Sequence, residues 1–341
     1  MGQRPVPTRA RTRVGWIAAG TILLLGIVVL VSQLRDAAPA DVGRQRVRIA
    51  VHRPGTIAGL IAAGLVDVLG RRLPQVEVAE VEEPGMIATL RAIDSGQVDL
   101  GLAFNLVAFH AVKTEQVLGH RSAGVTALTV AYSNAAQIVV HRDSAVKRIV
   151  DLKGQRVNLG LEEGGGYFCS QILLSHLGFG PDDLSIQSGD FGPERLADLL
   201  QGRLDAYIDW RGMPVPDLAA AFASGELRLI PLEADSLQGL RMKHPFLVPW
   251  TIPARVYPHQ EASVPTVSAR MLVLGSRSLP PDLVEQILRT IDTHMPDLIA
   301  RHPAAAEINV TKRPTLDDGL SIDLHPGAER FFRSASGGRP E

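Results

Sequence analysis

The stretch Val-Asn-Leu-Gly-Leu-Glu-Glu-Gly-Gly-Gly-Tyr-Phe, residues 157–168, decides our prediction of the fold. It begins as a short apolar strand, passes through three consecutive glycines and enters a helix with an apolar stripe that ends at Gly178. Glycine has no Cβ, so the backbone is able to adopt positive φ and to come close to another group. The first amides of a helix lack internal acceptors and suit an anion. A plain tight turn is the alternative to a ligand loop. The candidate ligand contacts here are Gly164, Gly165, Gly166 and Tyr167.

The chain repeats this unit, because strand, loop and helix recur in the same order before and after Asp151. The first pass predicts strands at residues 47–51, 76–81 and 99–103, and helices at 56–69, with Thr56 as N-cap, and at 85–95. The second predicts strands at 157–159, 184–187 and 205–209, alternating with helices. Such alternation predicts an α/β fold of two lobes, with two mainly parallel sheets flanked by helices. Ligands of open sheets bind beyond the carboxyl ends of the strands. The loops at 52–56, 104–106, 161–166 and 210–213 are therefore predicted to line a cleft.

The remaining segments complete the two lobes. We assign residues 46–135 to the first part of lobe 1, 136–248 to lobe 2, and 249–333 to the return crossing and the rest of lobe 1. Residues 334–341, rich in serine and glycine, are predicted to be a disordered tail. Few segments pass between the lobes, so we expect a ligand to close them about crossings near residues 132–137 and 249–255.

The N-terminal segment, residues 1–45, predicts the compartment. Residues 14–34 contain no charged side chain and follow Arg4, Arg9, Arg11 and Arg13. This length is close to the ~20 residues that cross a bilayer, which favours an uncleaved anchor. A cleaved signal is the alternative, because Ala38 and Ala40 offer small residues for a peptidase. In both cases the arginines stay inside, and the folded part lies on the periplasmic or extracytoplasmic face of the membrane.

Composition excludes several function classes. The 341 residues are 45% hydrophobic and 21% charged, as in ordinary globular proteins, and the net charge of -1 gives no field for nucleic acid. The single cysteine, Cys169, falls on an apolar helix face and is predicted to be a core residue. The ten histidines lack zinc-site spacing, and the chain has neither a Gly-x-Ser-x-Gly elbow nor a phosphate-binding loop. We therefore expect no enzymatic activity, no metal and no cofactor.

Aromatic and charged residues beside the predicted cleft are further candidates. Phe104, Tyr132, Tyr167 and Trp210 lie at or beside cleft loops, although each one singly suits a core as well. Asp209, Trp210 and Arg211 follow one another at a strand end, where opposite charges beside an indole suit a small anion or zwitterion.

Several stretches together resemble the TAXI family of solute receptors of TRAP transporters. They occur in order between Arg46 and Phe332: Gly55-Thr56, Asp143-Ser144, Asp151-Leu152-Lys153-Gly154, Gly212-Met213-Pro214-Val215-Pro216, Thr251-Ile252-Pro253-Ala254, Tyr257-Pro258, Val264-Pro265-Thr266-Val267, His302-Pro303-Ala304-Ala305 and His325-Pro326-Gly327-Ala328-Glu329-Arg330. The resemblance implies a periplasmic-binding-protein-like fold with a hinged cleft. It also implies a receptor that delivers a small organic acid or amino acid to the membrane subunit of a sodium-coupled TRAP transporter.

The chain departs from the family where the ligand is expected. Residues 52–58 replace a glycine-rich loop with paired tyrosines, Glu163 to Gly166 replace Gly-Ser-Gly-Thr, and Phe104-Asn105-Leu106 replace Gln-Ser-Asp. Hydroxyl groups are lost and charges are gained. Arg53 and Arg211 are expected on opposite lobes, where they would hold a carboxylate between them, as in a dicarboxylate or an acidic amino acid. Asp209 would then bind a ligand amino group or hold Arg211 in position; solvated rim arginines are the alternative. The candidate set also contains Gly55, Thr56 and Asn105.

Three functions remain open from the sequence. The first is a monomeric receptor that serves a TRAP-type transporter. The second is a membrane-anchored ligand sensor that signals to a membrane partner, since an uncleaved anchor is unusual for a diffusing receptor. The third, an enzyme, lacks a recognisable motif.

Overall fold

The computed structural model describes residues 2, 45–54, 56–189 and 192–336. The predicted signal or anchor at residues 14–34 and nearly all of the tether therefore lie outside the described residues. From Arg46 onward the chain forms one compact unit. Among the described residues, no helix is both long enough and apolar enough to cross a bilayer.

Lobe 1 is the half of this unit built on strands β1 (Gln45–Val51), β2 (Val76–Glu82) and β3 (Leu100–Phe104). Strands β1 and β3 run parallel, and each of the three strands is followed by a helix: α2 (Ile57–Arg72), α3 (Met86–Asp94) and α4 (Asn105–Lys113). The predicted elements of the first pass are confirmed. The prediction of a loop at residues 104–106 is wrong, because α4 begins at Asn105; its sequence is apolar on nearly every side and gives no helical stripe.

Two long antiparallel strands, β4 (Val125–His141) and β10 (Val264–Ser276), run through both lobes. The first part of β4 pairs with β10, and its second part pairs with β7 (Ala206–Arg211) of lobe 2. Ser133 and Asn134 lie inside this single buried strand, within the predicted crossing near residues 132–137. The return strand is β10 and not residues 249–255, because β9 (Val248–Ile252) pairs alongside the first part of β10.

Lobe 2 contains the second pass of the repeat. Its strands are β5 (Arg156–Asn158), β6 (Ser185–Ile186), β7 and β8 (Leu227–Ile230), and its helices are α5 (Gly165–His176), α6 (Pro193–Leu200), α7 (Pro216–Phe222) and α8 (Ala234–Lys243), with a 3-10 turn η1 (Ile149–Leu152) before β5. Strand β5 is parallel to β6 and β7, as predicted, while β7 and β8 are antiparallel to β4. Cys169 on α5 is fully buried, as predicted for a core residue.

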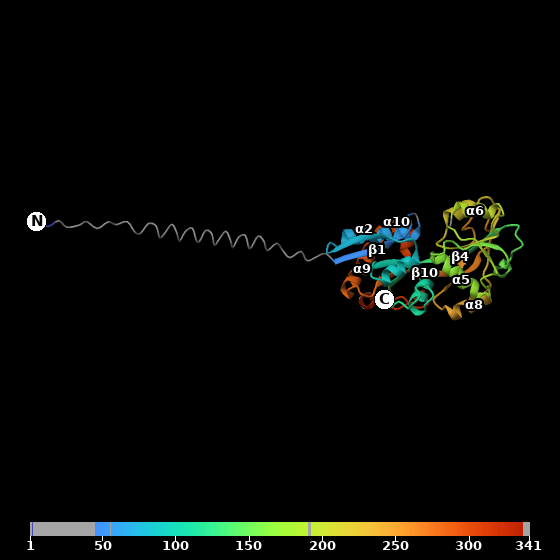
Figure 1. Cartoon of the computed structure of the whole chain (residues 1–341). Helices are drawn as coiled ribbons and strands as arrows, with labels where there is room; N and C mark the ends of the chain where they lie inside the picture. Colours follow the sequence, from blue (N-terminus) through green and yellow to red (C-terminus); the bar gives the residue numbers. More distant parts are fainter. Residues whose placement is uncertain (1, 3–44, 55, 190–191, 337–341) are drawn as a thin grey trace. The chain divides into compact units, whose positions relative to one another are not determined.

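The C-terminal part returns to lobe 1. It forms α9 (Pro281–Thr293), α10 (Met295–Arg301), a 3-10 turn η2 (Pro303–Glu307) and α11 (Pro326–Ser336). Figure 1 shows α2, α9 and α10 near β1, and α5, α6 and α8 at the other end of the folded unit. The predicted tail begins too early, because α11 continues to Ser336.

The ten strands of the described residues belong to one hydrogen-bonded sheet with the order β2-β1-β3-β10-β4-β7-β5-β6; β8 pairs with β4 and β9 with β10. The two sheets expected from the repeat are thus joined by β4 and β10, and parallel pairing is kept at β1–β3 within lobe 1 and at β5–β6 and β5–β7 within lobe 2. The chain has the two-lobed α/β architecture of periplasmic binding proteins, as predicted.

Candidate ligand-binding cleft

A cavity of about 740 Å³ lies between the two lobes. Its size falls within the range of small-molecule sites. Lobe 1 contributes the ends of β1, β2 and β3, and lobe 2 contributes the loops after β5 and β7. The lining residues are His52, Arg53, Pro54, Thr56, Ile57, Ala58, Leu60, Pro84, Gly85, Met86, Phe104, Tyr132, Asn134, Leu161, Gly164, Gly165, Gly166, Trp210, Arg211, Gly212, Pro214, Val215, Pro216, Met271 and His302.

Five described helices begin at this cavity, α2, α3, α4, α5 and α7, because each follows a strand that ends there and its N-cap residue lines the cavity. The N-cap of α2 is Thr56, whose Oγ1 accepts a hydrogen bond from the Gly59 amide at 3.0 Å. Helices α3 and α5 have glycine N-caps, Gly85 and Gly164, which supply no side-chain acceptor. The first amides of these two helices consequently lie at the cavity without a capping side chain. Uncapped helix N-termini attract anions through their N–H groups and their partial positive charge.

The glycines of this site allow the two lobes to approach each other closely. A Cβ on Gly165 would lie 2.5 Å from Met86 Sδ and 3.0 Å from Phe104 Cδ2, both in lobe 1. A Cβ on Gly85 would lie 2.8 Å from the carbonyl oxygen of Glu163 in lobe 2. Positive φ does not explain why glycine occupies these positions, since Gly164 has a φ of -86° and Gly165 and Gly166 are not among the residues with positive φ. Bare backbone at these positions is what the contact requires.

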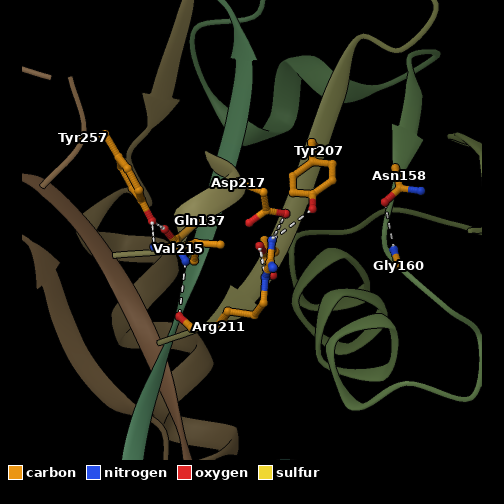
Figure 2. Close-up of polar contacts among 9 residues, drawn as sticks. Gln137, Asn158, Gly160, Tyr207, Arg211, Val215, Asp217 and Tyr257 are labelled. Atoms are coloured by element: carbon orange, nitrogen blue, oxygen red, sulfur yellow. Dashed lines mark hydrogen bonds and ion pairs between the residues drawn. The ribbon is translucent and has the colours of Figure 1, made fainter. Parts of the chain in front are cut away.

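Arg211, at the end of β7, is held by two carboxylates (Figure 2). Its Nε donates to Asp209 Oδ2 at 2.6 Å, and its Nη2 donates to Asp217 Oδ2 at 3.1 Å and to the Tyr207 hydroxyl at 3.3 Å. Burial opposes the charge of Arg211, but the carboxylates of Asp209 and Asp217 outweigh it and raise its pKa. Complete burial raises the pKa of Asp209, partly offset by Arg211. The side chain of Arg211 is thus fixed as a cation at the wall of the cavity.

A hydrogen-bond chain continues from Arg211 to Gln137 on β4, one of the two strands that run through both lobes. Gln137 on β4 donates to the Arg211 carbonyl at 3.2 Å and accepts a hydrogen bond from the Tyr257 hydroxyl, which itself accepts from the Val215 amide at 3.2 Å (Figure 2). These contacts tie the end of β7 and the start of α7 to a long strand shared by both lobes. The position of Arg211 therefore depends on β4 as well as on its own loop.

His52 lines the cavity as a neutral group. Its Nε2 lies 2.9 Å from Thr89 Oγ1, and burial lowers its pKa to about 4. At neutral pH this imidazole consequently adds no positive charge to the site.

The structure brings most of the predicted site residues together. Those that line the cavity are Arg53, Thr56, Phe104, Tyr132, Gly164, Gly165, Gly166, Trp210 and Arg211. Gly55 lies outside the described residues. Tyr167 and Asp209 do not line the cavity, and Asp209 supports Arg211 from behind.

Asn105 has a structural role that differs from the prediction. It is fully buried, and its Nδ2 donates to the carbonyls of Phe246 at 2.9 Å and Gly319 at 3.0 Å. These bonds fasten the start of α4 to two distant segments. A polar residue after a buried strand suggests a ligand contact, but α4 turns this side chain into the core.

Sequence reasoning missed several lining residues. Met86 and Gly85 follow β2, so the rule that placed the other loops at the carboxyl ends of strands would have found them. Asn134 and Met271 lie inside β4 and β10, where local patterns give no signal. These two residues were missed because the sequence does not show that β4 and β10 are long strands shared by both lobes.

Residues 60–335 match the NMT1-like family. The chain belongs to this family. It is also 26% identical over 214 residues to the "Putative aliphatic sulfonates-binding protein" of Escherichia coli (strain K12), with 61% of this chain and 61% of that relative covered. The chain thus spans about 61% of the length of this curated relative.

Several solved structures are also similar to this NMT1-like protein. The periplasmic aliphatic sulphonate binding protein SsuA from Escherichia coli has a TM-score of 0.48 and 19% identity, covering 86% of this chain and 94% of its own. The alkanesulfonate-binding protein SsuA from Xanthomonas axonopodis pv. citri bound to MOPS has a TM-score of 0.45 and 19% identity, covering 84% and 83%. The finer resemblance to TAXI receptors stays a prediction.

Proposed function

We propose that this protein is an extracytoplasmic solute-binding receptor whose lobes close on a small organic anion and present it to a membrane transporter. The observation that carries the proposal is the cavity between the lobes, lined by both of them and bordered by two uncapped helix N-termini. Membership of the NMT1-like family and likeness to a relative named as a sulfonate-binding protein support the receptor class. A TRAP-type permease is the partner we propose, from the TAXI resemblance.

The charged groups of the cavity support an anionic ligand. Arg53 of lobe 1 and Arg211 of lobe 2 both line it, so an oxoanion between them would contact both lobes and favour closure. The amides at the starts of α3 and α5 would donate further hydrogen bonds. Of the two roles considered for Asp209, the bond to Arg211 supports that of holding the guanidinium in place.

We propose that the cleft binds its ligand without chemical turnover, and that no cofactor is involved. The thiol of Cys169 is fully buried, and its pKa is raised by this burial, so it is a poor nucleophile. Within the described part of the chain, no group of three or more His, Cys, Asp or Glu side chains is placed to hold a metal ion. None of the described residues that line the cavity is a cysteine, serine, aspartate or glutamate, so we propose that these side chains bind and orient the ligand.

Ligand screening followed by scattering tests the proposal. The chain from about residue 45 onward, which we expect to be monomeric, is screened by thermal shift against carboxylates, sulfonates and amino acids. A ligand that raises Tm should also reduce the radius of gyration in small-angle scattering, because closure brings the lobes together. Absence of any stabilising anion, or an unchanged radius at saturation, would refute a hinged anion receptor.

Arg53→Ala gives the cleanest variant for the anion contact. Arg53 is exposed and lines the cavity, and a charge-assisted hydrogen bond contributes ~1.5–3 kcal/mol. The Kd of the variant for the anionic ligand should therefore rise by roughly ten- to a hundredfold. Arg46→Ala is the matched control, because Arg46 is exposed on β1, is not among the residues that line the cavity and forms a long, exposed ion pair of 3.8 Å with Glu77. Equal affinity in both variants would remove Arg53 from the site.

A further inference from the structure

Two carboxylates in lobe 2 share one guanidinium. Arg211 Nε donates to Asp209 Oδ2 at 2.6 Å, and its Nη2 donates to Asp217 Oδ2 at 3.1 Å (Figure 2). The three groups therefore carry a net charge of -1 when all are ionised. Asp209 is fully buried, and its Oδ1 has no hydrogen-bond partner among the described residues. A buried carboxylate with one unpaired oxygen is costly, and a proton would reduce that cost.

Strand β4 and the segment between β9 and β10 present uncharged groups to Asp209. Alternate residues of a strand share a face, so Tyr207, Asp209 and Arg211 of β7 lie on the same side. Gln137 of β4 is in register with Asp209 and accepts a hydrogen bond from the Tyr257 hydroxyl. Burial raises the pKa of both phenols, which are neutral at physiological pH.

Helices α6 and α7 form one apolar cluster with Tyr207 and so lie on this same face of β7. In α6, Arg195 pairs with Asp198 at 3.0 Å, and Glu194 is exposed. The charged residue of α7 is Asp217 itself. Among the described residues, Arg211 is therefore the cation that acts on the ionisation of Asp209.

An anion in the cavity would be a third negative charge at this guanidinium, because Arg211 lines the cavity. Charges interact strongly in a site that is largely removed from water, and a proton on one carboxylate would relieve the repulsion. Asp209 is the better acceptor, because its side chain is 0% exposed and that of Asp217 is 17% exposed. Burial raises the pKa of Asp209 even before an anion binds.

We infer that an anion bound at Arg211 is captured together with a proton from solvent, which adds to the carboxylate of Asp209 and converts it to a neutral carboxylic acid. No covalent bond other than this O–H bond forms or breaks. The inference rests on the proposed receptor function and adds its regulation by pH. Uptake of one proton per anion makes Kd rise about tenfold for each pH unit, so the receptor holds an anion more tightly in acidic surroundings.

Two histidines of the cavity are alternative proton acceptors. His52 and His302 both line it, and an anion beside either ring would favour the protonated form. The other titratable groups of the lining besides Arg211 are Arg53 and Tyr132, which carry their protons at neutral pH. Variants must therefore separate Asp209 from the two histidines.

Calorimetry of ethanesulfonate and benzenesulfonate binding measures the proton directly. Both probes stay ionised between about pH 5 and pH 8.5, so a proton taken up belongs to the protein. The change of binding enthalpy with the ionisation enthalpy of the buffer gives the number of protons. We expect the parent protein to take up between about 0.3 and 1 proton per anion, and Asp209→Asn to take up about none.

Three variants are matched controls that should keep the uptake, even where Kd changes. His52→Gln and His302→Gln remove the alternative acceptors. Asp198→Asn makes the same chemical change elsewhere in lobe 2, where Asp198 pairs with Arg195 and Arg203. Tm confirms that each variant is folded.

Asparagine at position 209 also distinguishes a proton acceptor from a merely structural residue. It resembles the protonated aspartate in shape and charge, so Asp209→Asn should bind the sulfonates roughly tenfold more tightly than the parent at about pH 8 and equally at about pH 5. Loss of a structural contact would instead weaken binding. In urea without a probe, the parent should gain stability relative to Asp209→Asn as the pH falls from about 8 to about 5, because the folded state binds the additional proton.

The outcomes separate this inference from the receptor function. Sulfonate binding without proton uptake, or uptake that persists in Asp209→Asn and is lost in either histidine variant, would overturn the proton linkage but leave an anion receptor. Failure of both sulfonates to bind would overturn both. Should Asp209→Asn fail to fold, uptake that persists in His52→Gln and His302→Gln still supports Asp209 as the acceptor, and its loss overturns the linkage.

Discussion

Alanine at Gly85 tests whether the contact between the lobes belongs to the bound state. Gly85 is the N-cap of α3 in lobe 1, and its φ of 179° and ψ of -177° are an extended conformation that alanine also adopts. In the structure, a Cβ at this position would lie 2.8 Å from the Glu163 carbonyl oxygen in lobe 2. The new methyl group therefore meets backbone only where the two lobes touch.

The size of the effect follows from this distance. Ordinary Cβ contacts begin near 3.4 Å, so the loops must move apart by roughly 0.6 Å, the difference from 2.8 Å. Overpacking of this kind costs ~1–3 kcal/mol, which corresponds to a Kd roughly 5- to 150-fold weaker. When the lobes are apart the methyl group meets no such obstacle, so the free energy of unfolding of the open protein should change little.

Calorimetry and small-angle scattering on Gly85→Ala, with a ligand found by thermal-shift screening, make the measurement. Gly70→Ala is the control in the same lobe, because the nearest atom to its Cβ, in Val78, lies at an ordinary 3.8 Å. Alanine within helix α2 should stabilise the fold slightly and leave Kd unchanged. If Gly85→Ala binds and contracts like the parent protein, the approach of residue 85 to Glu163 is not part of ligand-induced closure and our reasoning is wrong.

Three further predictions concern residues around the cleft. Arg211→Ala should lower the free energy of unfolding, measured in urea, by ~3–5 kcal/mol, because it removes the ion-pair partner of the fully buried Asp209. Adding Asp209→Asn to this variant should restore part of the loss. Equal stability of the parent protein and Arg211→Ala would contradict the pairing. Asn105→Ala should lower the free energy of unfolding by ~1–3 kcal/mol, because the carbonyls of Phe246 and Gly319 lose their donor, and it should leave Kd unchanged. A higher Kd in the folded variant would show that Asn105 does contribute to ligand binding. The pKa of His52 is about 4 in the folded protein against an ordinary 6.5, so the unfolded chain binds a proton more readily. Its contribution to the free energy of unfolding is therefore complete above pH 6.5, falls by about 2 kcal/mol at pH 5 and levels off below pH 4. Urea titrations across this range should show this dependence of stability on pH in the parent protein and a smaller dependence in His52→Gln.

The close contacts between the two lobes at the cleft could not be predicted from the sequence. The glycine loop after β5 is recognisable as a special backbone position, but its partners, Met86 and Phe104, lie in lobe 1 and belong to an earlier pass of the repeat. Glycine is equally expected for a turn, an anion site or a close contact. Only the arrangement of the two lobes distinguishes the third reason from the other two.

The order of strands and helices along the chain, the repeat, and the loops at the carboxyl ends of strands were predictable from the sequence, because they depend on local periodicity and on the chirality of parallel crossovers. For this reason the strand ends alone place Arg53, Phe104, Gly165 and Trp210 at the cleft, where the cavity has them. Tertiary structure decided what depends on residues distant along the chain. It made one strand of residues 125–141, directed Asn105 to Phe246 and Gly319, and placed Asp209 behind Arg211. A hydrogen bond across 141 residues, such as that from Asn105 to Phe246, leaves no periodic trace in the sequence, because it depends on how two separately folded segments pack.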